Sequence, residues 1–126
     1  MAGSNNEQGV DVAALIEDDK NRTKIVCQLC SSVILLPGKA AYVSKEFPLP
    51  HMKKKKEGTD VADAEELSDY WVVDDMFTFE NVGFSNTVGM IKYLTCADCE
   101  IGPVGWHDLN NKKAYYISLT RVQHVQ

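Results

Sequence analysis

The chain has 126 residues, of which 44% are hydrophobic and 25% are charged, and its formal net charge is −5. This composition is typical of one soluble globular domain and excludes a chain that is disordered throughout or a disulfide-dense miniprotein. The acidic balance disfavours a general nucleic-acid-binding protein, because such a protein needs a basic surface. Apolar runs such as residues 33–36 are far too short to cross a bilayer, so we expect no stable membrane insertion.

The first 21 residues are expected to form a flexible N-terminal tail, followed by a single domain over residues 22–126. The tail is polar at its centre, and only residues 12–16 have the apolar composition of a short helical turn. It also lacks the basic start and the apolar stretch of a secretory signal. We therefore expect a cytoplasmic protein, located in the cytosol.

The first half of the domain is expected to contain three strands and a charged loop. Strands are predicted over residues 24–26, 33–36 and 40–47, with Pro48 and Pro50 breaking the last one. Residues 51–68 are expected to form the loop, in which four consecutive lysines precede an acidic stretch. Charge blocks of this kind usually stay solvated. The alternative interpretation is a contact of the lysines with acidic lipids.

From residue 70 the chain is strand-like almost to its end. Strands are expected over residues 70–73, 76–80, 90–95 and 114–122, where aromatic and β-branched residues are frequent. In the second of these, alternation places Phe77 and Phe79 on one face. If that face is buried, Met76 points to solvent. These elements predict a mostly β fold built from antiparallel sheets, with helix confined to short pieces.

Four cysteines form two pairs with identical spacing, Cys27–Cys30 and Cys96–Cys99. Two intervening residues let one tight turn present two thiolates to a tetrahedral Zn²⁺, and two such turns supply all four ligands of a closed, structural site. The 65 residues between Cys30 and Cys96 exceed the gap of an ordinary zinc finger, so the metal is expected to pin two distant hairpins together. Free buried cysteines and disulfides are the alternatives, and a cytosolic setting disfavours disulfides.

No catalytic set or phosphate-binding loop is visible, so the function is expected to depend on a surface. Met76 beside Asp74 and Asp75 suits an adaptable protein-binding patch, unless a neighbouring hairpin covers it. Asp98 lies inside the second cysteine turn, where its carboxylate either faces a partner or accepts backbone hydrogen bonds. Trp106 follows a Gly-Pro loop and is either presented by it or, as is more common for tryptophan, part of the core.

Three longer motifs are distinctive: VCQLC at residues 26–30, DMFTFENVGF at 75–84 and IKYLTCADCEIGPVGWH at 91–107. Together they resemble the Rab-interacting factor family (RABIF), whose mammalian founder suppresses a yeast secretory-GTPase defect. The resemblance covers about residues 22–124. It implies an antiparallel β-tent that is held at one end by a structural Cys₄ site with one Zn²⁺.

The resemblance also implies a guanine-nucleotide exchange factor and chaperone for exocytic Rab GTPases in vesicle transport. Such a protein binds the GTPase in its nucleotide-free form, releases nucleotide slowly and has no active site of its own; we expect a monomer. The matching positions for Rab contact lie near the zinc and include Asp75, Met76, Phe77, Glu80, Asn81 and Asp98.

Two other functional classes are weighed against this one. A methionine-R-sulfoxide reductase shares a similar tent and two CxxC pairs, but its chemistry needs a nucleophilic cysteine outside the metal site, and none remains here. A zinc-ribbon nucleic-acid module is disfavoured by the sequence pI of about 5.1.

Overall fold

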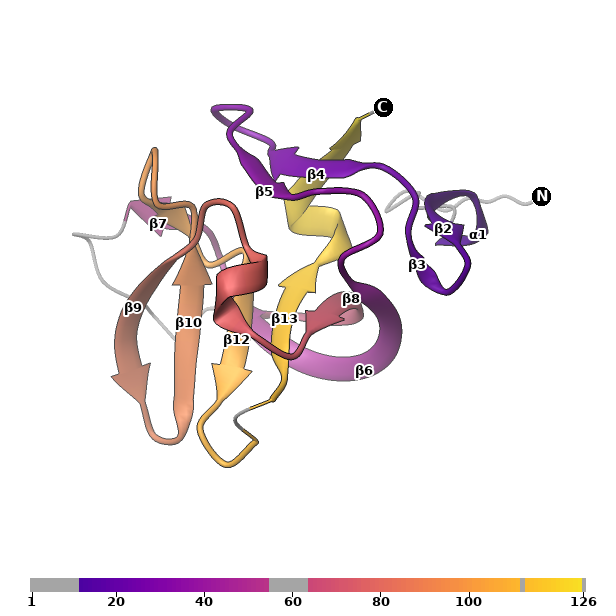
Figure 1. The fold of residues 1–126 in the computed structure, drawn as a ribbon. Coiled ribbons are helices and arrows are strands. Elements are labelled where there is room, and N and C mark those ends of the chain that lie inside the picture. The colour runs from indigo at the N-terminus through magenta and orange to yellow at the C-terminus, as the bar shows by residue number, and fades with distance from the viewer. Residues whose placement is uncertain (1–11, 55–63, 112, 126) are drawn as a thin grey trace.

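Figure 1 shows the computed structural model of the chain, which describes residues 12–54, 64–111 and 113–125. Short antiparallel strands dominate this part of the chain, and the helical pieces span three or four residues each. The helical pieces are α1 (Val12–Leu15), η2 (Met76–Thr78) and η3 (Leu119–Arg121). The strands are β2 (Ile16–Glu17), β3 (Lys20–Asn21), β4 (Lys24–Cys27), β5 (Val33–Leu35), β6 (Ala41–Pro50), β7 (Lys53–Lys54), β8 (Ala64–Val73), β9 (Gly83–Val88), β10 (Ile91–Thr95), β11 (Ile101–Gly102), β12 (Gly105–Asp108), β13 (Tyr115–Ser118) and β14 (Val122–Val125).

The strands form one large sheet and two small ones. The large sheet has the order β2-β3-β6-β8-β13-β12-β10-β9, and the three-stranded sheet has the order β14-β4-β5. In Figure 1 the three-stranded sheet lies above β10, β12 and β13, and the pair β11-β7 flanks β10. Every assigned pairing is antiparallel, which confirms the predicted mostly antiparallel β fold. No helix among the described residues is long and apolar enough to span a membrane.

The large sheet carries a hydrophobic core on both faces. Successive residues of a strand point to opposite faces, and on β8 Tyr70 joins one buried cluster while Trp71 joins the other. The Trp71 cluster contains Cys27 and Cys96, so it extends to the region of the cysteines. In the Tyr70 cluster the Trp106 ring stacks on Tyr116 with ring centroids 4.2 Å apart. The cysteines therefore stand at the edge of a packed core that both sheets share.

The folded part of the chain begins before the expected boundary at residue 22. The expected helical turn is present as α1, and residues 16–21 contribute β2 and β3 rather than a flexible tail. Asn21 is only 2% exposed, and its Oδ1 accepts hydrogen bonds from the backbone N–H groups of Lys39 and Ala40 at 2.9 and 2.8 Å. One buried amide thereby fastens residues 12–21 to the turn before β6. The rest of the expected tail, residues 1–11, lies outside the described residues.

Strand β6 continues through both prolines, so the expected break after residue 47 is wrong. Pro48 pairs with Glu66 and Pro50 with Ala64, so residues 64–68 also lie in a strand and not in the expected charged loop. The other neighbour of β6 is β3, which pairs with it only at Ala41, so the proline end of β6 is an edge where a missing N–H costs no ladder bond. Residues 55–63 of the expected loop lie outside the described part of the chain.

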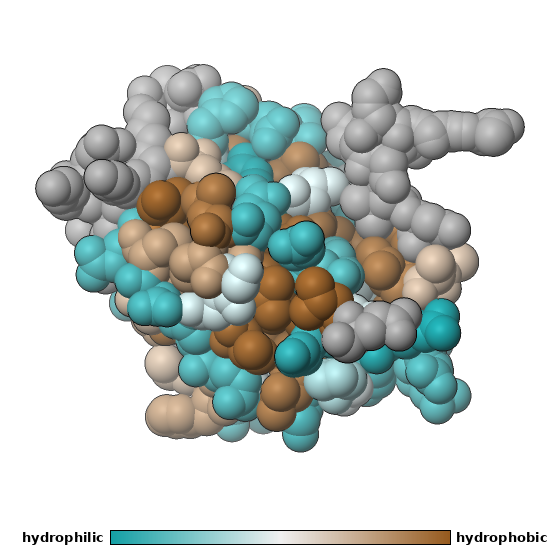
Figure 2. Space-filling view, turned by 90° about the horizontal axis from the view of Figure 1, so that it is seen from above, coloured by the Kyte–Doolittle hydropathy of each residue, from teal (hydrophilic) through white to brown (hydrophobic). Residues whose placement is uncertain are grey.

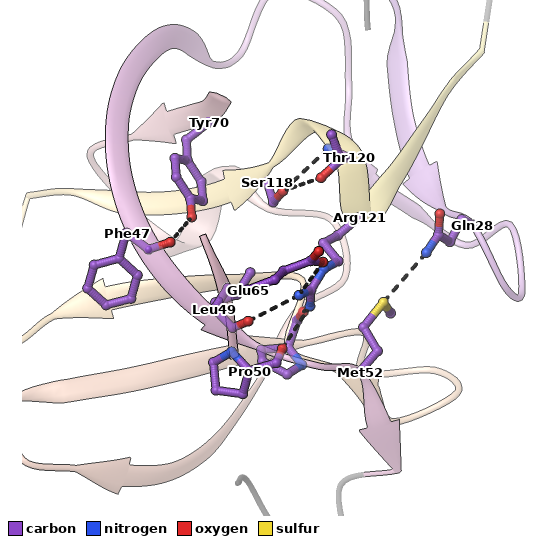
Figure 3. A network of polar contacts seen from close by, with 11 residues as sticks. Gln28, Phe47, Leu49, Pro50, Met52, Glu65, Tyr70, Ser118, Thr120 and Arg121 are labelled. Atoms are coloured by element: carbon purple, nitrogen blue, oxygen red, sulfur yellow. Dashed lines mark hydrogen bonds and ion pairs between the residues drawn. The ribbon is translucent and has the colours of Figure 1, made fainter. Parts of the chain in front are cut away.

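The expected long strand over residues 114–122 is interrupted by η3. This bend transfers the chain from β13 in the large sheet to β14 in the three-stranded sheet. Arg121, which is 5% exposed, donates hydrogen bonds to the carbonyl oxygens of Pro50 and Pro103 at 2.9 and 2.8 Å. It also reaches the Leu49 carbonyl at 3.2 Å and the Glu65 carboxylate at 3.1 Å (Figure 3). One buried guanidinium thus closes the bend against β6 and β8.

Candidate functional site

The four cysteines occupy two turns of the same construction. Cys27 ends β4 and Cys30 precedes β5, whereas Cys96 follows β10 and Cys99 precedes β11. Each turn is closed by a 2.9 Å hydrogen bond to the carbonyl of its first cysteine, donated by Ser31 in one turn and by Glu100 in the other. Ser31 and Glu100 both have positive φ angles, 66° and 61°. The repeated spacing therefore produces two equivalent turns, here called the first and the second cysteine turn.

The two cysteine turns bring their sulfur atoms together. The Cys27 and Cys99 sulfurs are 3.7 Å apart, those of Cys30 and Cys96 are 3.6 Å apart, and all four lie within 4.8 Å of one another. Tetrahedral zinc with metal–sulfur bonds of about 2.3 Å requires sulfur–sulfur distances of about 3.8 Å. The donor set and its spacing fit one tetrahedral metal ion, and they place two hairpins that are distant in sequence side by side.

The thiol groups of the cluster differ in their proton affinity. Burial raises the pKa of the Cys27 thiol and raises that of Cys99 to about 12. A hydrogen bond with Ser32 lowers the pKa of Cys30, which is exposed, to about 7. A metal ion binds the thiolate form, so binding must release protons from the thiols of Cys27 and Cys99 and must weaken as the pH falls.

Hydrogen bonds connect the two cysteine turns with each other and with the segment that follows η2. Ser32 donates to the carboxylate of Asp98, which joins the first turn to the second. Asn81 accepts a hydrogen bond from the backbone N–H of Ala97 at 3.0 Å and donates one to the Cys96 sulfur at 3.3 Å. Of the residues that the resemblance assigns to Rab contact, Asn81 and Asp98 therefore also have partners inside the protein.

These contacts surround a hollow of about 390 Å³ beside the cluster. It is lined by Ser32, Val33, Asn81, Ala97 and Asp98. Figure 2 looks down on this end of the molecule, where hydrophobic and hydrophilic residues lie side by side on one face. Two of the six expected contact residues line this hollow. Asn81 lies shortly before β9, and Asp98 lies in the second cysteine turn.

Residues 76–78 form the 3₁₀ turn η2, so the expected strand over residues 76–80 is wrong. Asp75 caps this turn, because its Oδ1 accepts a 2.8 Å hydrogen bond from the backbone N–H of Phe77. The condition that the face with Phe77 is buried is not met, since Phe77 is 84% exposed. Met76 is exposed at 39%, but because of the turn and not because of strand alternation. Asp75, Met76 and Phe77 thus form an exposed turn, and Glu80, also exposed, follows it.

Two further residues clarify which side chains are available to a partner. Trp106 is 2% exposed and belongs to the core, so the Gly-Pro loop does not present it. Leu29, which the sequence interpretation did not single out, is 56% exposed at the tip of the first cysteine turn. Its position between Cys27 and Cys30, whose spacing is typical of metal ligands, was the available signal in the sequence. A residue at the tip of such a turn has no neighbour to cover it.

All four cysteines of the chain belong to the cluster. A sulfoxide reductase would need a further cysteine as its nucleophile. The arrangement therefore offers a closed metal site and a neighbouring exposed surface, and it offers no thiol for that chemistry.

Comparisons with known proteins agree on one family. The model of the family described as Mss4 protein matches residues 20–124. A Drosophila melanogaster protein named guanine nucleotide exchange factor MSS4 homolog is 45% identical over 115 residues, which cover 90% of this chain and 93% of that protein. A Schizosaccharomyces pombe protein with the same name is 35% identical over 91 residues, 71% of this chain and 86% of the relative.

Proposed function

The chain belongs to the Mss4 family, and from that premise we propose that it is a guanine-nucleotide exchange factor and chaperone for small GTPases of the exocytic Rab group. It acts in the cytoplasm, binds the GTPase in its nucleotide-free form and promotes nucleotide release. The observation that carries the proposal is the 45% identity with an exchange-factor homologue over nearly the whole of both chains. The exposed turn η2 beside the cysteine turns supplies a surface for the partner.

The four cysteines hold one structural Zn²⁺. A set of four thiolates at these distances is typical of zinc or iron–sulfur sites, and the two-residue spacing within each pair is the common zinc arrangement. With four sulfur ligands the ion has no open position for water or substrate, so its contribution is to the fold. It binds the two cysteine turns to each other and thereby supports the surface next to them.

The contact surface combines an apolar turn with carboxylates. Phe77 and Met76 supply exposed apolar area, and an aromatic side chain that is 84% exposed in the free protein gains most from burial by a partner. Asp75, Glu80 and Asp98 add negative charge around it. A GTPase holds its nucleotide phosphates with a lysine and backbone N–H groups, and these become available when the nucleotide leaves. Carboxylates at the rim suit that positive site.

Exchange follows from differential binding. If this protein binds the empty GTPase more tightly than the loaded form, it must weaken nucleotide affinity by the same factor, and the nucleotide must weaken the complex equally. A thousandfold coupling corresponds to about 4 kcal/mol and still leaves appreciable nucleotide affinity, because a GTPase binds nucleotide very tightly. Slow release together with stable holding of the empty form is the expected behaviour.

The proposal is tested by the release of a fluorescent GDP analogue from an exocytic Rab. The release rate should rise with the concentration of this protein, EDTA should promote the complex, and GDP with Mg²⁺ should dissolve it. The variants Met76→Ala and Asp98→Ala should release nucleotide more slowly while zinc content is retained. Met90→Ala is the matched control, because Met90 is also exposed but lies at the opposite end of β10 from Cys96.

Two results would reject the exchange-factor function. One is a release rate that does not change at saturating protein. The other is a complex that is equally tight with GDP–Mg²⁺ and with the empty GTPase, because equal affinity for both forms shifts no equilibrium.

A further inference from the structure

Asn81 occupies the junction between the exposed turn and the cysteine cluster. Its Oδ1 accepts the backbone N–H of Ala97 at 3.0 Å, and its Nδ2 donates to the Cys96 sulfur at 3.3 Å. A backbone N–H can only donate, so the amide oxygen must face Ala97 and the amide N–H group must face the sulfur. Both ends of the Asn81 side chain are therefore engaged within the protein.

We propose that Asn81 is a positioning residue for the metal site and that its side chain couples the cysteine cluster to the segment 75–80. The second part rests on the proposed function, because that segment is the one assigned to the GTPase. The first part concerns this chain alone. It replaces the role that the family resemblance implies for Asn81, direct contact with the partner, by a role inside the site.

The hydrogen bond to Cys96 is the contact that makes Asn81 part of the metal site. Four thiolates and one Zn²⁺ leave a net charge of −2, and an N–H donor directed at a sulfur stabilises that charge. The Cys96 side chain is 0% exposed, so water does not replace the donor. Cys27 receives its own hydrogen bond from the backbone of Leu29 inside the first turn. The hydrogen bond of Asn81 to Cys96 comes from a separate segment of the chain, outside the two cysteine turns.

The neighbouring residue provides the mechanical link. The backbone N–H of Glu80 donates to the Ile34 carbonyl at 2.7 Å, in the strand that follows the first cysteine turn. Asn81 is bound to Ala97 in the second cysteine turn. Two consecutive residues are thus attached to two different hairpins, and both attachments require the hairpins to lie side by side, as they do at the cluster. The segment 75–80 ends at this double attachment, so its placement depends on the metal site.

Zinc affinity distinguishes the positioning role from a contact role. Asn81→Asp keeps the acceptor for Ala97 but places a negative oxygen against the Cys96 sulfur, and Asn81→Ala removes both hydrogen bonds. Competition with a chromophoric chelator should show zinc binding that is weaker by about 10- to 100-fold for either variant. The thiolate-to-cobalt absorption band of the Co²⁺-loaded protein should shift in both. Asn110→Asp adds the same charge at an exposed loop position and should change neither measurement.

A second measurement follows GTPase binding at saturating zinc. Asn81→Ala should then regain binding only in part, because excess metal restores the cluster but the variant still lacks the side chain that links Ala97 to the segment 75–80. Unchanged zinc affinity and an unchanged cobalt band in both variants would overturn the proposal, and loss of GTPase binding in that case would identify Asn81 as a direct contact. If the wild-type protein binds no GTPase at all, the proposed function fails while the zinc measurements still decide the role of Asn81. If Asn81→Ala does not fold, the nearly isosteric Asn81→Asp carries the same test.

Discussion

Two ties hold distant parts of this chain together, and they are built in different ways. The cysteine cluster joins residues that are 66 and 72 positions apart, and the Arg121 side chain reaches carbonyl groups 71 and 72 positions away. The cysteine tie needs a bound ion and consists of a repeated motif. The arginine tie needs only hydrogen bonds to backbone carbonyls and consists of a single residue that belongs to no sequence motif.

Both ties join distant segments of the chain, but the cysteine tie is conditional on a bound ion, whereas the arginine tie is permanent. Metal binding to a site that does not exist in the unfolded chain adds its free energy to folding, so the cysteine tie depends on metal supply and pH. The guanidinium satisfies three buried carbonyl groups by itself and needs no bound ion to do so. The conditional tie lies beside the proposed contact surface, whereas the permanent one lies beneath the bend at η3.

Breaking the cysteine tie should have the largest effect on stability. Cys27→Ser or Cys99→Ser removes one of four ligands, so the folded chain loses metal-binding free energy that offsets a loop-closure cost of about 3–4 kcal/mol. We expect the free energy of unfolding at saturating zinc to fall by at least that amount, measured by urea titration. Leu29→Ala, in the same turn but 56% exposed, is the control and should have little effect. An unchanged unfolding curve for both cysteine variants would contradict the existence of the tie.

Breaking the arginine tie should cost less and should leave the metal site intact. Arg121→Met leaves the carbonyl groups of Leu49, Pro50 and Pro103 without their donor, and we expect a loss of about 2–3 kcal/mol in the free energy of unfolding. Zinc affinity should stay at the wild-type value. Glu65→Gln tests the ion pair alone; because the Glu65 side chain is 47% exposed, the expected loss is below about 1 kcal/mol. A large loss of zinc affinity in Arg121→Met would mean that the two ties are coupled.

The exposed turn near the cysteine tie should contribute to binding and not to stability. Phe77→Ala should change the free energy of unfolding by no more than about 0.5 kcal/mol, since the side chain is 84% exposed. GTPase affinity should fall by about tenfold or more, as for an aromatic residue at the centre of an interface. Both quantities are measured on the same zinc-loaded sample, with Met90→Ala as the control. A destabilised variant would show that Phe77 packs in the fold.

The smallest expected effect is the pH dependence contributed by His124. Its Nε2 accepts a 3.0 Å hydrogen bond from Trp71, and burial lowers the pKa of the imidazole. The unfolded chain therefore binds a proton more readily than the folded one. This contribution to stability is complete above about pH 6.5, and it is lost progressively as the pH falls below that value. His124→Gln keeps an acceptor for Trp71, so the difference between wild type and variant in urea titrations at pH 7 and pH 5 isolates the effect; equal pH dependence would contradict it.

The sequence predicted the sheet type and the cysteine turns correctly, and it missed where a cap or a strand edge changes the local pattern. The antiparallel β fold followed from alternation and turn residues, and the cysteine turns followed from their spacing. Phe77 was placed in a strand because its segment alternates, although Asp75 caps a turn there instead. Pro48 was expected to end a strand, because nothing in the sequence indicates that β6 is an edge at that point.

By itself the sequence determined the composition of the metal site, because two thiolates separated by two residues are brought into ligand geometry by a single turn. It also determined the family, through motifs that surround that site. Only the tertiary structure decided which residues far apart in the chain contact one another. Arg121 is recognisable as a tie only in the folded chain, where η3 turns it toward Leu49 and Pro50. Asn81 is recognisable as a neighbour of the cluster only where β10 brings Cys96 beside it. Such contacts join residues far apart in the chain, so they depend on the packing of whole sheets and leave no local pattern.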